Sequence, residues 1–100
     1  LSVSGTTDGT AETPRASLEQ NIPNPFNPAT VIRFTLERPG PVELAIYNAA
    51  GREVERLIDR RMEAGMHELT WAPASLPSGV YFYRLRADGK SFSRKAILVR

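Results

Sequence analysis

Apolar and polar residues alternate along most of the chain after about residue 17, which is the pattern of half-buried β-strands. In residues 30–37, for example, Ile32, Phe34 and Leu36 fall on one face and polar side chains separate them. The other expected strands are residues 18–21, 42–47, 66–71, 80–87 and 92–99, with turn-forming residues between them. Counting the segment discussed next, about seven strands at this spacing predict an all-β, immunoglobulin-like antiparallel β-sandwich.

Residues 52–62 fit two patterns. Val54, Leu57, Ile58 and Met62 would lie on one side of a helix, but the segment also reads as a strand. We predict a strand, because the neighbouring segments are strands and a short helix here would lack a suitable N-terminal cap.

The strongest turn signal is Asp88-Gly89, because a two-residue type I′ hairpin turn needs residues that tolerate positive φ. Such a turn sets the register of the last hairpin, with Leu85 opposite Phe92 and Tyr81 opposite Ala96. Arg94 then falls on the core-facing side, so we expect a β-bulge that shifts the register there.

The opposite face of this hairpin is polar near the turn and apolar far from it. The apolar end carries Val80, Phe82, Ile97 and Val99, with Lys95 among them. An exposed apolar patch with a basic rim is a candidate contact site, although another loop or residues 1–16 could cover it.

Two other sequence segments contain residues that shape the backbone. Leu76-Pro77-Ser78-Gly79-Val80-Tyr81 has the form of a tyrosine corner, in which a Tyr hydroxyl bonds the backbone a few residues upstream. Asn24-Pro25-Phe26-Asn27-Pro28 contains two Asn-Pro turns, for which the sequence suggests only a role in strand entry.

Composition excludes several function classes. One hundred residues form one domain, with residues 1–16 expected as a flexible linker and 17–100 as the sandwich. The net charge is +2 with dispersed basic residues, so we expect no nucleic-acid binding, and no segment is long and apolar enough to span a membrane.

The residues also give little support for catalysis. There is no cysteine, and His67 is the only histidine, so a metal site is not expected. His67 could formally combine with Ser75 or Ser78 and Asp59, but no nucleophile elbow is present. We expect a non-enzymatic domain without a cofactor.

Several segments together resemble one known family. Asn-Ile-Pro-Asn-Pro-Phe-Asn-Pro-Ala-Thr at residues 21–30 resembles the opening of the type IX secretion system C-terminal sorting domain. Residues 42–54, 64–71 and 76–83, and the basic-apolar-basic ending at 94–100, are similar to later parts of that family. The immunoglobulin-like domain of the flagellar hook-capping protein has a related pattern.

This resemblance implies a C-terminal secretion signal and surface-anchoring module without an active site. An outer-membrane translocon would recognise it. A sortase-like protease would cut the upstream linker, and an N-terminal passenger would be attached to lipopolysaccharide. The protein would pass the periplasm and outer membrane of a Gram-negative bacterium to be secreted or held at the cell surface. The end at Arg100, directly after the last expected strand, suits a true C-terminus.

The family motifs point to Pro77, Gly79, Tyr81 and Lys95 as recognition residues, and a role in folding alone is the alternative for the first three. The apolar patch adds the other candidates, which are Phe82, Ile97 and Val99. The alternative is a passive spacer or a carbohydrate-binding sandwich of a multidomain secreted hydrolase. A sugar platform would need an exposed aromatic face, whereas Trp71, the only Trp, lies in a core-facing alternation.

Overall fold

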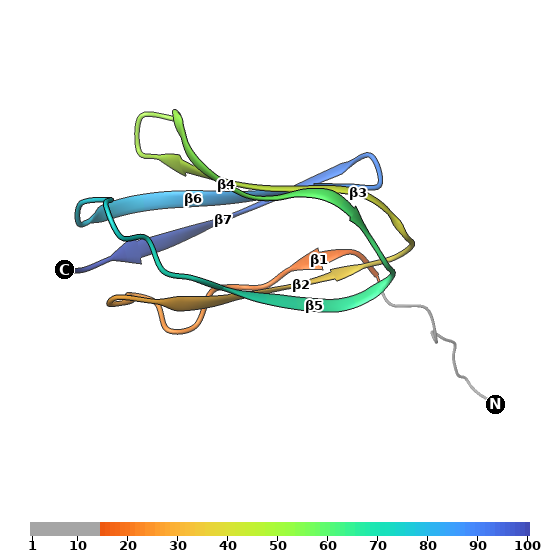
Figure 1. Ribbon diagram of the computed structural model, residues 1–100, viewed down its shortest axis with the longest axis horizontal. Coiled ribbons are helices and arrows are strands. Elements are labelled where there is room, and N and C mark those ends of the chain that lie inside the picture. The colour runs from red at the N-terminus through yellow and green to blue at the C-terminus, as the bar shows by residue number, and fades with distance from the viewer. Residues whose placement is uncertain (1–14) are drawn as a thin grey trace.

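The computed structural model describes residues 15–100, which form two packed antiparallel sheets (Figure 1). Its strands are β1 (Ser17–Leu18), β2 (Thr30–Leu36), β3 (Gly40–Asn48), β4 (Glu53–Met62), β5 (Gly65–Trp71), β6 (Gly79–Ala87) and β7 (Lys90–Leu98). One sheet has the order β1-β2-β5 and the other β4-β3-β6-β7. The predicted all-β sandwich of seven strands is confirmed, and the ambiguous segment is the strand β4.

The core lies between the two sheets and follows the expected alternation. Ile32, Phe34 and Leu36 of β2 are almost completely buried, and the intervening residues are not. The inward side chains of β3 and β6 are buried in the same way, and Ala45 of β3 is the one residue between them that is also buried. The largest fully buried side chains include Trp71, Tyr83, Phe26 and Phe34. Burial of this apolar surface is the main favourable contribution to folding.

The turn between β6 and β7 has the predicted geometry. Asp88 has φ 58° and Gly89 has φ 73°, as a type I′ turn requires. The register is the expected one, with Leu85 opposite Phe92. Because side chains alternate strictly along a strand, this register decides which residues of the hairpin face outward.

The bulge expected at Arg94 is wrong. The pairing of β6 with β7 is continuous, with Arg94 opposite Tyr83. Arg94 keeps its core-facing position because β7 is an edge strand of its sheet, so its long side chain can reach the other layer. There its Nε donates a hydrogen bond to the carbonyl oxygen of Leu18, 2.9 Å away.

The first strand is shorter than predicted, ending at Leu18 instead of residue 21. The reason is that the backbone N–H of Asn21 bonds a side chain and not a neighbouring strand. Its N–H donates to the Tyr83 hydroxyl at 2.7 Å, and its side-chain amide donates to the Thr30 hydroxyl at 3.0 Å. The expected linker, residues 1–16, lies almost wholly outside the described residues.

Candidate interaction surface on the terminal hairpin

The residues proposed from the sequence fall into two groups. Phe82, Lys95, Ile97 and Val99 lie on or beside the outer face of the β6–β7 hairpin. The remaining three, Pro77, Gly79 and Tyr81, belong to the loop before β6 and to the start of that strand. The first group can meet a partner directly, whereas the second lies where it can support the first.

Strand register brings the outward residues together. Val80 lies opposite Ile97, and Phe82 lies opposite Lys95. The N–H and C=O of Ile97 point away from β6, so Val80 and Ile97 form a non-hydrogen-bonded pair, in which side chains approach closely. We call Val80, Phe82, Ile97 and Val99 the apolar patch.

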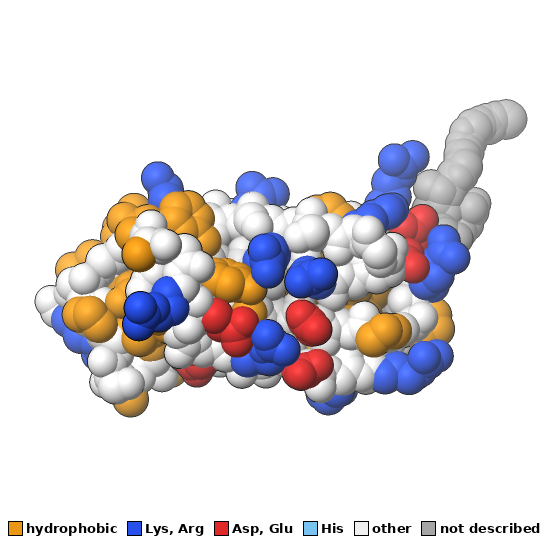
Figure 2. Space-filling view, turned by 90° about the horizontal axis from the view of Figure 1, so that it is seen from above, with side chains coloured by type: hydrophobic (Ala, Val, Ile, Leu, Met, Phe, Trp, Pro, Cys, Tyr) orange, Lys and Arg blue, Asp and Glu red, His pale blue; other side chains and the backbone are white. Residues whose placement is uncertain are grey.

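The apolar patch reaches solvent in the described structure. Val80 is 37% exposed, Phe82 38% and Val99 48%. Figure 2 shows the outer face of the β4-β3-β6-β7 sheet, where hydrophobic side chains gather toward the end at which β7 finishes and charged ones occupy the middle. Contiguous apolar surface of this kind marks interaction sites in soluble domains.

The tyrosine corner is confirmed. The Tyr81 hydroxyl donates a 2.7 Å hydrogen bond to the Pro77 carbonyl oxygen. The Tyr81 ring is only 4% exposed and meets Trp71 edge-on, with centroids 6.1 Å apart. Pro77, Gly79 and Tyr81 therefore build the corner under the hairpin, and Tyr81 does not face a partner.

The most important residue that the sequence did not indicate is Phe26. Its ring is 1% exposed and lies against Trp71, with centroids 5.1 Å apart. Its backbone bonds β7, because the Phe26 N–H donates to the Ile97 oxygen at 2.9 Å and the Val99 N–H donates to the Phe26 oxygen at 3.0 Å. The sequence feature that could have indicated its role is a large aromatic residue within an otherwise polar, proline-rich segment.

Two side chains extend this contact along the outer edge of β7. The Asn24 Oδ1 accepts a hydrogen bond from the Ile97 N–H at 2.8 Å. The Gln20 Nε2 donates to the Lys95 carbonyl oxygen at 2.6 Å. Residues 22–28, which we call the Asn-Pro segment, lead into β2 and, together with Gln20, close the edge of the terminal strand.

The last residue is also fixed to the domain. The Arg100 N–H donates to the Ser78 hydroxyl at 2.8 Å, and its Nε donates to the Leu76 carbonyl oxygen at 2.6 Å. Its guanidinium also donates to the Pro73 carbonyl oxygen. These bonds hold the end of the described chain against the loop that carries the tyrosine corner.

Charge is distributed unevenly over the outer face. On the β3–β4 side, Arg56 lies within 4.0 Å of the carboxylates of Glu43, Glu53 and Asp59. The hydrogen bond between Arg56 and Glu53 raises the pKa of the arginine and lowers the pKa of the glutamate. The acidic residues on this side are therefore already paired.

The β6–β7 side is basic. Its outward side chains are Val80, Phe82, Arg84 and Arg86 from β6, and Ser91, Ser93, Lys95 and Ile97 from β7. None is acidic, and within residues 15–100 none of the three cations forms an ion pair. Arg84 lies over the Tyr47 ring at 4.8 Å and donates to the Tyr47 hydroxyl at 2.7 Å. Its Nε is buried without a hydrogen-bond partner in the part of the chain that the structure describes.

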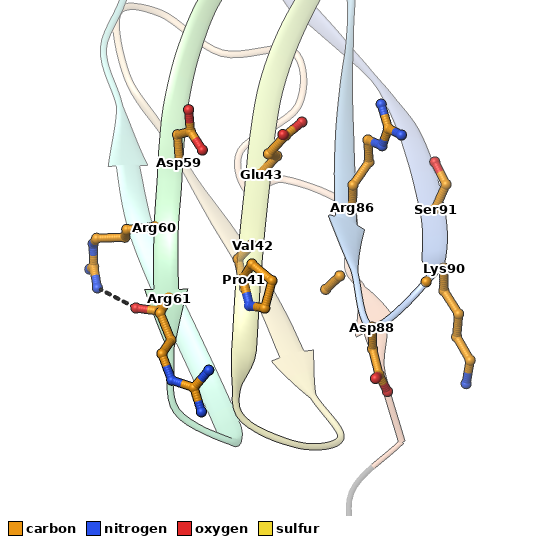
Figure 3. Close-up of a pocket in the computed structure, with 12 residues that line it drawn as sticks. Pro41, Val42, Glu43, Asp59, Arg60, Arg61, Arg86, Asp88, Lys90 and Ser91 are labelled. Carbon is orange, nitrogen blue, oxygen red and sulfur yellow. Dashed lines mark hydrogen bonds between the residues drawn. The ribbon is translucent and has the colours of Figure 1, made fainter.

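A hollow of about 420 Å³ lies at the turn end of the same face. It is lined by charged residues of both signs, and Figure 3 shows Arg61 and Arg86 directed toward opposite ends of it. Asp88 is paired with Arg38 at 3.1 Å. These groups do not converge on a common point, so the hollow shows no arrangement for a specific ligand.

The candidates for catalysis have structural roles. His67 is half-buried, stacks on Phe34 at 5.4 Å and donates through Nε2 to the Glu63 carbonyl oxygen. The Ser78 hydroxyl accepts from Arg100. Residues 15–100 contain no group of three potential metal ligands, and no helix there could cross a membrane.

Comparison with known proteins agrees with the resemblance. Neither the curated proteins nor the solved structures include a match. The sequence model of one family, described as a secretion system C-terminal sorting domain, matches residues 21–99, which covers the sandwich from the Asn-Pro segment to the end of β7. The chain therefore belongs to the type IX secretion system C-terminal sorting domains, which are signals for export to the cell surface or the medium.

Proposed function

We propose that this domain is a non-catalytic signal that an outer-membrane translocon recognises through the end of the β6–β7 hairpin. The family match over residues 21–99 is the observation that carries the proposal. The apolar patch supports it, because this is where the outer face of the sandwich offers contiguous apolar surface beside basic side chains.

The later steps of export follow from the same proposal. A passenger lies N-terminal to the sandwich and is carried out with it. A sortase-like protease then cuts before β1, and the passenger is attached to lipopolysaccharide. A cut at this place would release the passenger and leave the sandwich intact, because Ser17 begins the first strand.

The burial of Trp71 argues against the carbohydrate-binding alternative. Trp71 is 1% exposed, and its indole N–H donates to Glu55 at 3.1 Å, so it cannot serve as an exposed sugar platform. The passive-spacer alternative predicts that the domain can be exchanged for another sandwich without loss of export. The experiment below separates it from the proposed signal.

The test is export of a reporter fused in front of residues 1–100, in a bacterium with type IX machinery. We expect the reporter at the cell surface or in the medium, and none in a strain that lacks the translocon. Deletion of residues 91–100, or exchange for an unrelated immunoglobulin-like sandwich, should abolish export while the reporter stays folded and active. Normal export of either fusion would overturn the proposal.

A further inference from the structure

We propose that the recognising partner binds the outer face of the terminal hairpin, not its edge, through a segment that carries a bulky apolar side chain beside a carboxylate. This inference rests on the proposed function and specifies the chemistry of the partner. Three features of the described residues lead to it: a closed strand edge, a hollow with aromatic walls, and basic side chains that form no ion pair within residues 15–100.

The edge of β7 is closed where recognition is expected. Addition of a partner strand needs outward backbone N–H and C=O groups that are free to pair. At the terminal end of β7 these groups belong to Lys95, Ile97 and Val99. Gln20, Asn24 and Phe26 already bond the Lys95 oxygen, both Ile97 groups and the Val99 N–H. A partner strand would have to displace the Asn-Pro segment, whose Phe26 ring is buried in the core.

The outer face has a hollow beside the apolar patch. It measures about 290 Å³ and is lined by Tyr47, Phe82, Arg84 and Ser93, together with the turn after β3. The hollow is open on the outer face of the sheet, so a side chain of a partner lying on that face can enter it. Its aromatic walls favour an apolar group.

The charges beside the hollow favour a carboxylate. Lys95 lies opposite Phe82 on one side, and Arg84 follows Phe82 along the same face of β6. Neither forms an ion pair within residues 15–100, but Arg84 has an acidic neighbour, because Arg56 and, to a smaller extent, Arg84 lower the pKa of Glu53. Lys95 is therefore the cation on which the inference of a carboxylate chiefly rests. Since the outward side chains of β6 and β7 include no acid, an acidic partner meets no like charge on these strands.

The test measures binding of the full fusion protein to outer-membrane vesicles prepared from a host with the type IX machinery. We expect Lys95→Glu and Phe82→Ser each to weaken binding by at least about tenfold, as for residues central to an interface. The loss with Lys95→Glu should shrink at high salt, because salt screens an exposed ion pair.

Matched controls separate this surface from general effects. Arg86→Glu reverses a charge on the same face near the turn and should change binding by less than about twofold. Asn24→Ala should leave affinity unchanged, since it alters the edge and not the face. Thermal unfolding shows that the variants are folded, which we expect because Phe82 and Lys95 are exposed.

Three results would overturn the inference. They are unchanged binding of both Lys95→Glu and Phe82→Ser, tighter binding of Asn24→Ala, and equal binding to vesicles without the machinery, which would indicate lipid as the partner. If deletion of residues 91–100 blocks export but Lys95→Glu and Phe82→Ser bind normally, only the face inference fails. If the deletion does not block export, the proposed function fails.

Discussion

The two proline-containing segments that flank the terminal strand hold it in different ways. The loop before β6 acts locally, because the Tyr81 hydroxyl bonds Pro77, four residues upstream. The Asn-Pro segment acts across the chain, because Asn24 and Ile97 are 73 residues apart in sequence. Both segments meet at Trp71, which contacts the Phe26 ring on one side and the Tyr81 ring on another.

This difference bears on how the interaction surface is kept in shape. The local corner fixes the start of β6, while the long-range contact fixes the end of β7. The apolar patch lies across these two strand ends, so it needs both. We expect the long-range contact to contribute more stability, because it includes a fully buried aromatic ring as well as backbone hydrogen bonds.

The largest effect should come from Phe26→Ala. Removing a buried aromatic side chain leaves a cavity next to Trp71, which should lower the free energy of unfolding by about 3–5 kcal/mol. Chemical denaturation of the purified domain measures this. Ile22→Ala is the matched control, because Ile22 lies in the same segment but is 65% exposed. A loss of similar size in both variants would show that the segment does not act through the Phe26 ring.

The next largest effect should come from removing a tyrosine hydroxyl, and two such variants can be compared. The Tyr83 hydroxyl accepts from the Asn21 N–H and donates to the Glu19 carbonyl oxygen at 2.6 Å, so both its partners are distant in sequence. Tyr83→Phe leaves the buried Asn21 N–H unpaired and should cost about 1–3 kcal/mol, against about 0.5–1.5 kcal/mol for Tyr81→Phe. If the variants keep the wild-type dependence of the unfolding free energy on denaturant concentration, the shifts in their denaturation midpoints give both costs. A larger cost for Tyr81→Phe would show that the local hydroxyl bond contributes more stability than the long-range one.

Alkaline pH tests the same long-range bond without a change of residue. Burial raises the pKa of Tyr83 to about 12 from an ordinary value of 10.0, although the Asn21 N–H and Arg94 partly oppose the shift. The folded state therefore favours the neutral phenol. Its contribution is complete below pH 10 and is lost as the pH rises toward 12.

Stability measured against pH checks this prediction. The wild-type domain should lose stability across that range, and Tyr83→Phe should lack the part of the loss that Tyr83 causes. Identical pH profiles for the two proteins would contradict a raised pKa at this position.

The difference between contacts that are local in sequence and contacts that are distant in sequence also explains what could be predicted from the sequence. The strand positions, the Asp88-Gly89 register and the Tyr81 corner depend on residues close together in the chain, and all three are confirmed except for the extent of the first strand. The role of Phe26 could not be predicted, because its partners are brought together only when the two sheets pack. Arg94 shows the same limit: the alternation placed it correctly, but its acceptor belongs to the other sheet.

For the candidate surface, the sequence indicated which residues share a face but not which backbone groups are free. Alternation and the hairpin register placed Phe82, Lys95 and Ile97 together. Closure of the β7 edge depends on Gln20 and Asn24, more than 70 residues upstream of the groups they bind. The choice between recognition by the face and by the edge therefore required the structure.

The smallest effect should come from Asn24→Ala, which removes one exposed side-chain acceptor and should cost less than about 1 kcal/mol. Its readout is local. The Ile97 amide should exchange its hydrogen faster, because it loses its acceptor, while the Val99 amide keeps its bond to the Phe26 oxygen and its slow exchange. Asn27→Ala, in the same segment, is the matched control and should change neither amide. Faster exchange at both Ile97 and Val99 in Asn24→Ala would mean that Asn24 holds the whole segment in place, so that the long-range contact depends on an exposed side chain and not on the buried ring.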